Sequence, residues 1–408
     1  MEINSNHMKI LVINYEYPPI GGGGGFVTRD ILEQIVRLGH HVSVVTSHFR
    51  GLKKYELVNG VELFRVPVLF RTKKEVANMP SLLSYFPSSL IHAVVKLQSR
   101  KYDVINTHFA IPSGPAGYLL SKLFKVPNVL SLHGGDIFDP SKSLSPHRTP
   151  LLRNVVKFNL NRADGVVAQS NDTKLNACKY YDVARSIEVI PLGIKKPVFA
   201  KKTRRDFHLD SDAMVFCTIG RLIKRKNLDD ALEVLSEIKA EYKFKLLVIG
   251  EGPERAHLET LQKQYGLEEA IMFFGNVSDE VKFQLLDLSD FYLSTALHEG
   301  FGLVFLEAME CGLPVICYNR GGQNDFLVDG KTGFLIEVAN KRAFYKKTIE
   351  LIRNKRLRDD MSYYNKRVIN SYYINNCADK YVSLFETVIS QASCYLDVPS
   401  GTGNEARP

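Results

Sequence analysis

Residues 291–318 read FYLSTALHEGFGLVFLEAMECGLPVICY. The apolar run Phe291–Ser294 predicts a strand, two glycines then mark a loop, and the run that follows predicts a helix. Gly312 and Pro314 end that helix, because glycine favours the position after a helix and proline cannot continue one. A second apolar run follows at once. The stretch is therefore a strand–helix–strand unit of the kind that builds a parallel sheet covered by helices.

The same alternation of short Val- and Ile-rich runs with longer amphipathic stretches recurs along the chain. In the first half the predicted strands are Lys9–Asn14, His41–Thr46, Val61–Pro67, Val104–Thr107, Asn128–Leu132, Gly165–Ala168 and Ile187–Ile190. In the second half they are Met214–Gly220, Lys245–Gly250, Ile271–Gly275, Phe291–Ser294, Pro314–Tyr318 and Gly333–Ile336. Each half is expected to form its own doubly wound α/β sheet, with ligands bound at the carboxyl ends of the strands.

The chain can bury two hydrophobic cores, because 45% of its 408 residues are hydrophobic. We expect two Rossmann-like domains that face each other across a cleft, joined by a basic linker that contains Pro197. The expected segments are an N-terminal domain over 8–194, the linker over 195–212, a C-terminal domain over 213–376, a helix over 377–395 that packs back on the N-terminal domain, and a disordered tail over 396–408. The polar leader 2–7 is interpreted as an expression remnant and is left out of the fold prediction.

The excess positive charge is confined to one half of the chain. Residues 1–194 hold 23 Lys and Arg against 14 Asp and Glu, whereas residues 195–408 hold 30 against 30. A one-sided basic domain indicates either an anionic partner, such as a phosphate-bearing acceptor, a membrane surface or nucleic acid, or simply a protein kept soluble by its charge. Because no RNA- or DNA-binding motif is present, a nucleic-acid partner is not expected.

The six cysteines form no Cys-x-x-Cys pair, which suits a reducing compartment. No apolar run approaches the roughly 18 residues that a spanning helix needs, and the start of the chain lacks the apolar segment of a signal peptide. We therefore expect a cytoplasmic protein that is either soluble or peripheral on the inner face of the membrane. The basic and apolar stretch from Arg71 to Leu97 either docks on an anionic membrane, holds a lipid-linked acceptor, or forms an ordinary core helix.

The glycine loop before the predicted helix is suited to hold a phosphate. Gly300 and Gly302 let backbone N–H groups approach an anion, and the helix dipole favours its negative charge. Glu299 lies before this helix and Glu307 about one turn inside it, and carboxylates are good acceptors for sugar hydroxyls. Taken alone, the spacing of the two glutamates is more typical of a solvated helix face.

The two glutamates belong to a longer pattern that consists of the runs Glu299–Met309, Cys311–Ile316, Gly321–Gly322 and Asp329–Phe334. This pattern resembles the signature of glycosyltransferase family four. The resemblance implies a retaining enzyme of the GT-B fold that takes a nucleotide sugar as co-substrate and needs no metal or other cofactor. It assigns the donor sugar to Glu299, the ribose hydroxyls to Glu307, and the sugar and diphosphate to the backbone of Phe301, Gly302 and Leu303. Asp325 stands where the family more often has Glu, which leaves its role open.

A second basic element agrees with this resemblance. After the strand Met214–Gly220 the chain continues with Arg221-Leu222 and then Lys224-Arg225-Lys226-Asn227, which is similar to the family's Gly-Arg-Leu…Lys-Asn motif. Arg221 and Lys226 are expected to stabilise the charge that grows on the leaving phosphate. Lys224 and Arg225 are expected to face solvent. The resemblance also places the backbone of Val277 near the nucleotide base.

Two motifs follow strand ends in the N-terminal half. Gly21–Gly25 lacks the Gly-Lys-Ser/Thr ending of a P-loop, but counting back from Gly39-His40 places Gly22 and Gly23 on the family's glycine pair, which faces the donor phosphates. His133-Gly134-Gly135-Asp136 resembles the family's His-Gly-x-Asp motif. A neutral His133 would bond a donor sugar hydroxyl, and Asp136 would either contact the acceptor or cap its loop. His108 is a further acceptor-side candidate.

Together these motifs predict a retaining hexosyltransferase with an acceptor-binding N-terminal domain and a donor-binding C-terminal domain. The expected donor is a UDP-sugar and the expected acceptor a glycan or lipid-linked compound of polysaccharide or glycolipid synthesis. Two alternatives remain, a nucleotide-sugar epimerase of the same fold and a non-catalytic protein that binds nucleotide sugars or anions. A glycosidase is disfavoured, because the cation–glycine cluster suits a diphosphate leaving group better than paired catalytic carboxylates would.

Overall fold

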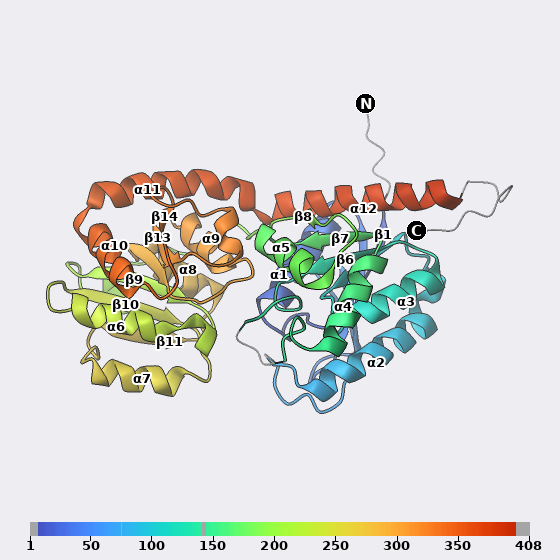
Figure 1. Cartoon of the computed structure of the whole chain (residues 1–408), viewed down its shortest axis with the longest axis horizontal. Helices are drawn as coiled ribbons and strands as arrows, with labels where there is room; N and C mark the ends of the chain where they lie inside the picture. Colours follow the sequence, from blue (N-terminus) through green and yellow to red (C-terminus); the bar gives the residue numbers. More distant parts are fainter. Residues whose placement is uncertain (1–6, 75, 141–143, 397–408) are drawn as a thin grey trace.

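The computed structural model describes residues 7–74, 76–140 and 144–396, which form two α/β domains (Figure 1). The strands of the first domain are β1 (Lys9–Asn14), β2 (His41–Ser47), β3 (Tyr55–Val58), β4 (Val61–Val66), β5 (Val104–His108), β6 (Asn128–Leu132), β7 (Gly165–Ala168) and β8 (Glu188–Val189). Its helices are α1 (Gly23–Arg37), α2 (Met79–Leu97), α3 (Gly114–Phe124), α4 (Pro150–Arg162) and α5 (Asn171–Tyr181).

The second domain repeats this architecture. Its strands are β9 (Met214–Ile219), β10 (Phe244–Ile249), β11 (Ile271–Gly275), β12 (Phe291–Ser294), β13 (Val315–Tyr318) and β14 (Gly333–Ile336). Its helices are α6 (Leu228–Ile238), α7 (Arg255–Gln264), α8 (Asp279–Asp287), α9 (Leu303–Glu310), α10 (Lys341–Arg353) and α11 (Lys355–Val368), and the chain ends in α12 (Ile374–Leu396). The short 3-10 turns η3 (Lys224–Lys226) and η4 (Gly322–Asp325) lie near the strand ends.

The two sheets are built from parallel neighbours. The first has the strand order β3-β4-β2-β1-β5-β6-β7-β8, and the second has the order β11-β10-β9-β12-β13-β14. Only the edge strand β3 is paired antiparallel, with β4, among the described strands. The central strands β1, β5 and β6 are buried along nearly their whole length, as expected for strands covered by helices on both faces. The α/β fold predicted from the sequence is confirmed.

All thirteen predicted strands are present, six of them with the predicted bounds. Strand β8 is shorter than predicted, because only two of its residues pair with β7. Strand β3 was not predicted, since its residues are only partly buried and show little apolar pattern. It is joined to β4 by Asn59 and Gly60, which have φ values of 47° and 82°. An Asn-Gly pair with positive φ at both residues is the preferred tight hairpin turn.

Helix α12 connects the two domains. Figure 1 shows it running from the second domain along the first, where it packs on α1, and Tyr381 and Phe385 are its largest buried side chains. The start of α12 is also bonded to the end of the first domain. The Ile194 N–H donates to the Tyr372 carbonyl at 3.0 Å, and the Ile374 N–H donates to the Ile194 carbonyl at 2.9 Å. The two segments that cross between the domains therefore lie side by side.

Some expectations fall at the limits of the described chain. The predicted tail lies outside the described residues except for residue 396, which ends α12. Residues 2–6 of the polar leader lie outside them as well. Within the described ranges, no helix combines the length and the apolar character needed to cross a membrane.

Candidate active site

Helix α9 begins at the glycine loop that follows β12. Gly302 precedes the helix with a φ of 92°, in the left-handed region that favours glycine, and a Cβ there would overlap the ring of Phe305. No side chain of the described chain caps this helix. Its first N–H groups are therefore available to an anion, and the helix dipole adds positive potential at the same point.

Glu299 is held at this loop by two cations. Its carboxylate is bonded to the Lys226 ammonium group, and the Arg225 guanidinium lies 3.2 Å away. Burial alone would raise the pKa of Glu299, but the charges and hydrogen bonds of Lys226 and Arg225 outweigh it and hold this pKa at about 2. Glu299 is therefore a buried carboxylate that stays ionised at neutral pH.

The contacts of Arg225 correct the prediction that it faces solvent. Its guanidinium is bonded to the His298 carbonyl oxygen as well as to Glu299. The tight η3 turn leaves Lys224 exposed, as expected, and brings the next two basic side chains to the same carboxylate. The sequence could not show this, because Arg225 and Glu299 are far apart along the chain and meet only where β9 and β12 are neighbours in the sheet.

Arg221 and Lys226 lie together at the end of β9. Both line a narrow pocket between the carboxyl ends of β9 and β10, and Arg221 is exposed there. Gly220 makes room for this arrangement, because a Cβ at Gly220 would lie 2.7 Å from Cε of Lys226. The structure thus gathers both predicted phosphate-side cations at one pocket, and Lys226 is the one of the two that is bonded to Glu299.

Glu307 has a cationic partner that sequence analysis missed. Lys282, on α8, lies with its Nζ atom 2.7 Å from a carboxylate oxygen of Glu307 and 2.8 Å from one of Asp279. Burial raises the pKa of Glu307, and the nearby Lys282 charge opposes this rise. The pair forms because α8 and α9 pack against each other, and no spacing rule in the sequence connects them.

Phe301, Leu303 and Val277 are the remaining residues that the resemblance assigns to the donor side. The Phe301 ring is buried against Phe326, with centroids 5.2 Å apart, so only the main chain of Phe301 can face a ligand. Leu303 begins α9, and Val277 follows β11 half-buried against the core.

His133 lies across from this cluster, directly after β6. Its ring stacks on Phe109, with centroids 4.3 Å apart, and its Nε2 atom lies 2.9 Å from Nδ1 of His108. Burial lowers the pKa of His133 to about 4, so the imidazole is neutral at neutral pH. Phe109, which sequence analysis did not single out, has a φ of 70° at the end of β5.

Asp136 holds the loop that carries His133. One carboxylate oxygen accepts a hydrogen bond from the His133 N–H at 2.9 Å, and the other accepts one from the Ala110 N–H at 2.7 Å. These contacts correspond to the capping role, one of the two roles expected for Asp136. His108 is fully buried behind His133 rather than at the cleft surface.

The glycine run at the start of α1 surrounds an open space. A Cβ built on Gly22 or Gly23 would meet no described atom within 4 Å, whereas one on Gly24 would lie 2.9 Å from the Phe109 ring and 3.4 Å from Nδ1 of His133. The two glycines that the sequence aligns with the family's pair are thus the two with free space beside them.

The loops of the two domains touch each other at this point. The Ser170 hydroxyl donates to the Gly300 carbonyl at 2.8 Å, and a Cβ on Gly134 would lie 3.2 Å from Cα of Gly300. Asp325 accepts a hydrogen bond from the Asn171 N–H at 2.7 Å, so it holds the start of α5 from the opposite domain. His133 and Glu299 are therefore brought to one site by contacts between the carboxyl ends of both sheets.

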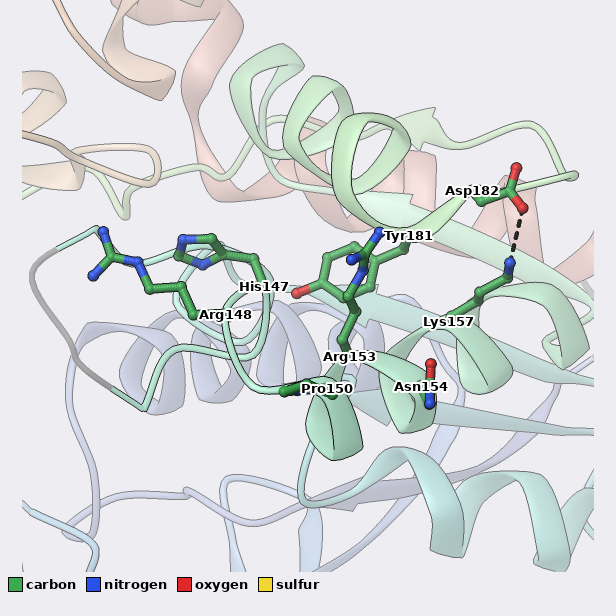
Figure 2. A pocket seen from close by; sticks show the side chains of 8 residues that line it. All are labelled: His147, Arg148, Pro150, Arg153, Asn154, Lys157, Tyr181 and Asp182. Carbon is green, nitrogen blue, oxygen red and sulfur yellow. Dashed lines mark hydrogen bonds and ion pairs between the residues drawn. The ribbon is translucent and has the colours of Figure 1, made fainter.

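A second pocket lies between α4 and α5 (Figure 2). Its lining is mainly basic, with His147 and Arg148 in the loop before α4 and Arg153 and Lys157 on α4. Asp182 pairs with Lys157 at 2.8 Å. The pocket is connected to the donor side by Phe138, whose ring contacts the rings of His147 and His298 at centroid distances of 4.7 and 5.4 Å.

Each of the two domains matches the profile of a known protein family. The family profile for Glycosyltransferase Family 4 matches residues 21–196, and the profile for Glycosyl transferases group 1 matches residues 199–368. The chain is 28% identical to N-acetyl-alpha-D-glucosaminyl L-malate synthase of Bacillus anthracis, over 93% of this chain and 97% of that one. It is 25% identical to D-inositol 3-phosphate glycosyltransferase of Corynebacterium urealyticum, over 93% and 96%. It is 24% identical to the phosphatidylinositol N-acetylglucosaminyltransferase GPI3 subunit of Saccharomyces cerevisiae, over 94% and 83%.

Solved structures show the same fold. Sucrose-phosphate synthase from Thermosynechococcus elongatus superposes with a TM-score of 0.83 at 19% identity, covering 94% of this chain and all of that one. Anabaena HepE in complex with UDP and glucose superposes with a TM-score of 0.76 at 20% identity, covering 93% and 100%. The two matched profiles and the shared two-domain architecture lead to one conclusion: the chain belongs to glycosyltransferase family four and is a glycosyltransferase of the GT-B fold.

Proposed function

We propose that the protein transfers a hexose-type sugar from a nucleotide sugar, a UDP-sugar in the first instance, with retention of configuration. The observation that carries this proposal is the cluster of Lys226, Arg225 and Glu299 beside the uncapped start of α9, with His133 facing it from the other domain. Cations and free N–H groups suit a diphosphate, and a buried ionised carboxylate suits sugar hydroxyls.

In the proposed reaction, the bond between C1 of the sugar and the terminal phosphate oxygen breaks. The acceptor hydroxyl oxygen forms the new bond to C1 from the same face, and the leaving phosphate oxygen takes the hydroxyl proton. Arg221, Lys226 and the α9 start hold the negative charge that grows on the phosphate, which lowers the barrier more than it strengthens substrate binding. The neutral His133 bonds the sugar without attracting the departing phosphate.

A panel of UDP, GDP, ADP and CMP in a thermal-shift assay, followed by their sugars, tests the donor. We expect UDP and a UDP-sugar to raise the melting temperature, since a ligand that binds only the folded state stabilises it. Analysis of the products then separates transfer from epimerisation. An epimerised nucleotide sugar without a new glycoside would favour the epimerase, and binding without any turnover would favour a non-catalytic binding protein.

We further propose that the acceptor carries an anionic group. The excess positive charge of the chain lies in residues 1–194. The pocket in Figure 2 belongs to this part of the chain, and Arg148 and Arg153 line it. The names of three relatives support this proposal, because they contain malate, inositol 3-phosphate and phosphatidylinositol. Arginine is well suited to carboxylate and phosphate groups.

Transfer assays with malate and with inositol 3-phosphate as acceptors test this second proposal. In the Arg148→Gln and Arg153→Gln variants we expect the KM for the acceptor to rise about tenfold while the donor KM stays unchanged, which corresponds to one lost charged hydrogen bond. Lys122→Gln, which removes an exposed charge from α3, is the matched control. Equal use of a neutral polyol acceptor by wild type would contradict the proposal.

We also propose that the α2–α4 face rests on an anionic membrane surface. Leu83, Ile91 and Val95 of α2 are 67%, 62% and 68% exposed, and the neighbouring helices add exposed apolar side chains, namely Leu119, Leu123, Leu151 and Phe158. An apolar face on a basic domain matches the chemistry of an anionic lipid surface.

Co-sedimentation with phosphatidylglycerol vesicles is expected for wild type and not for the Leu83→Ser/Ile91→Ser/Val95→Ser variant. Equal binding of the two proteins would contradict the proposal.

A further inference from the structure

The side chain of His298 belongs to the second domain but is buried against the first. His298 lies between β12 and α9, and only 6% of its side chain is exposed. Its Nε2 atom lies 3.1 Å from a carboxylate oxygen of Asp172, the second residue of α5. A carboxylate oxygen accepts hydrogen bonds, so Nε2 is the donor. The His298 ring meets the Phe138 ring edge-on, with centroids 5.4 Å apart. Two elements of the opposite domain therefore enclose this side chain.

Asp172 and Phe138 are both held in place by contacts within the first domain. The Asp172 oxygen that faces the histidine also accepts a hydrogen bond from the Asn176 amide at 3.0 Å, one turn further along α5. The Phe138 N–H donates to the Gly134 carbonyl at 2.8 Å, and the Phe138 ring stacks on Tyr180 with centroids 5.4 Å apart. The surface that encloses the histidine is thus built without any group of the second domain.

The main chain of His298 is tied to the charged cluster of the second domain. Its carbonyl oxygen accepts a hydrogen bond from the Arg225 guanidinium, which also lies 3.2 Å from the carboxylate of Glu299. Glu299 is the next residue along the chain and is bonded to Lys226 as well. A shift of His298 would therefore displace Glu299 together with the cations that hold it. His298 links the position of this carboxylate to the first domain.

The start of α5 makes two further contacts with the second domain. The Ser170 hydroxyl donates to the Gly300 carbonyl at 2.8 Å, and the Asn171 N–H donates to the Asp325 carboxylate at 2.7 Å. Three consecutive residues of the first domain thus contact the loop before α9 and the η4 turn. Of these three contacts, only the one made by Asp172 joins two side chains. It can therefore be removed by a substitution in either domain.

We propose that His298 and Asp172 are positioning residues that align the loop before α9 with the first domain. Their contact, supported by Phe138, sets where the Glu299 carboxylate lies relative to the N-terminal half of the site. The inference rests on the proposed function, in which Glu299 contacts the donor sugar and the acceptor binds to the first domain. The new glycosidic bond then forms across the domain boundary, where a misplacement of about 1 Å slows a reaction by roughly a hundredfold. UDP is expected to bind to groups of the second domain alone, such as Lys226, and needs no such alignment.

Steady-state kinetics and UDP titration of the full-length protein test this role. His298→Leu keeps an apolar side chain against Phe138 but cannot bond Asp172, and we expect it to lower kcat roughly tenfold to a hundredfold with unchanged UDP affinity. Asp172→Ala should give the same loss. The double variant should lose no more than either single variant, because both substitutions remove one contact. His298→Gln should restore most of kcat, since its amide N–H can replace the Nε2–H group.

Hydrogen exchange at the start of α5 tests the alignment without any ligand. The Asn171 N–H is protected by Asp325 of the opposite domain, so its exchange reports whether the two domains are in contact. We expect faster exchange in His298→Leu than in wild type. His257→Leu is the matched control, because His257 bonds Asp229 at 2.7 Å within the second domain. This variant should keep both the wild-type exchange rate and the wild-type kcat.

Three results would overturn the proposal: unchanged kcat in His298→Leu, a loss that His298→Gln does not restore, or wild-type exchange at Asn171 in His298→Leu. A parallel loss of kcat and UDP affinity would also contradict it, because the substitution would then have damaged the donor site itself. If His298→Leu does not fold, Asp172→Ala tests the same contact from the other domain. Faster exchange in a protein that transfers no sugar would support the alignment and contradict the proposed function alone.

Discussion

Lys226 and Glu299 form a buried ion pair between the ends of β9 and β12, with only 14% and 10% of their side chains exposed. Lys226 is expected to contact the phosphate of the donor, and Glu299 is expected to contact its sugar. Such a pair holds two charges in position before any ligand arrives, because either charge alone would be costly to bury. The site is therefore preorganised by residues 73 positions apart.

We expect Glu299→Ala to abolish transfer with only a mild loss of UDP affinity. The carboxylate is assigned to the sugar, while the phosphates keep Lys226 and the start of α9. Breaking the buried pair should also lower the free energy of unfolding by about 3 kcal/mol. Product formation, UDP titration and urea unfolding measure these effects. Lys224→Ala removes an exposed charge from the same turn and should change none of them.

Glu307→Ala is expected to weaken UDP binding roughly tenfold, the effect of one lost hydrogen bond to a charged group. Lys282→Met should weaken it as well, because it leaves Glu307 buried without its partner and raises the Glu307 pKa further. Isothermal titration with UDP measures both. Glu310→Ala on the same helix is the control, since Glu310 bonds Tyr373 instead. Unchanged affinity in the first two variants would contradict the assignment to the ribose.

Gly302→Ala should destabilise the protein more than Gly330→Ala. Both glycines have positive φ, at 92° and 74°, so each substitution incurs about 1–2 kcal/mol of backbone strain. Only at Gly302 would the new methyl group also overlap a neighbour, the Phe305 ring. Chemical unfolding of the two variants isolates this second cost. Similar stabilities would contradict the expected overlap between a methyl group at Gly302 and the Phe305 ring.

Gly22→Ala is expected to leave the stability within about 0.5 kcal/mol of wild type, because its φ is negative and its Cβ meets no described atom. Transfer should nevertheless fall, since the methyl group would enter the space proposed for the donor. Thermal unfolding without ligand and initial transfer rates separate the two effects. Full activity in a stable Gly22→Ala protein would place the donor elsewhere.

Stability should fall between pH 6.5 and pH 4 through His133. Its pKa is lowered from 6.5 to about 4 by burial, so in this range the unfolded chain binds a proton that the folded protein excludes. Glu299, with a pKa of about 2, begins to contribute only below its unfolded value of 4.5. In the His133→Gln variant, the free energy of unfolding should fall less than in wild type between pH 6.5 and pH 4.5. Parallel pH slopes for wild type and variant would show that His133 is solvated.

The sequence was most informative where the residues of the expected site are close together along the chain. The run from Phe291 to Gly312 predicted a strand, a glycine loop and a helix, and the structure confirms all three. Pairings between distant segments could not be predicted. Lys282 meets Glu307 only through the packing of α8 on α9, and Arg225 was wrongly placed in solvent because local charge density says nothing about a neighbouring strand end.

The N-terminal half was harder to interpret for a related reason. Its glycine run and its histidine motif lie more than 100 residues apart, and Gly24 meets His133 only after β1, β5 and β6 are assembled side by side. The hairpin of β3 carried a readable Asn59-Gly60 turn, but its half-exposed strand lacked the apolar pattern used to find the others.

The hydrogen bonds of Ile194 with Tyr372 and Ile374 tie together the two segments that connect the domains. Both connecting segments are bonded to each other at one point, so they form a paired pivot. Two connections that are bonded at one point permit a hinge rotation of one domain relative to the other. They resist a shear motion of the domains past each other. A hinge rotation would separate the loops at Gly134 and Gly300 and bring them back to the same positions. A substrate that enters while the domains are apart would then meet the same residues of both domains each time they close.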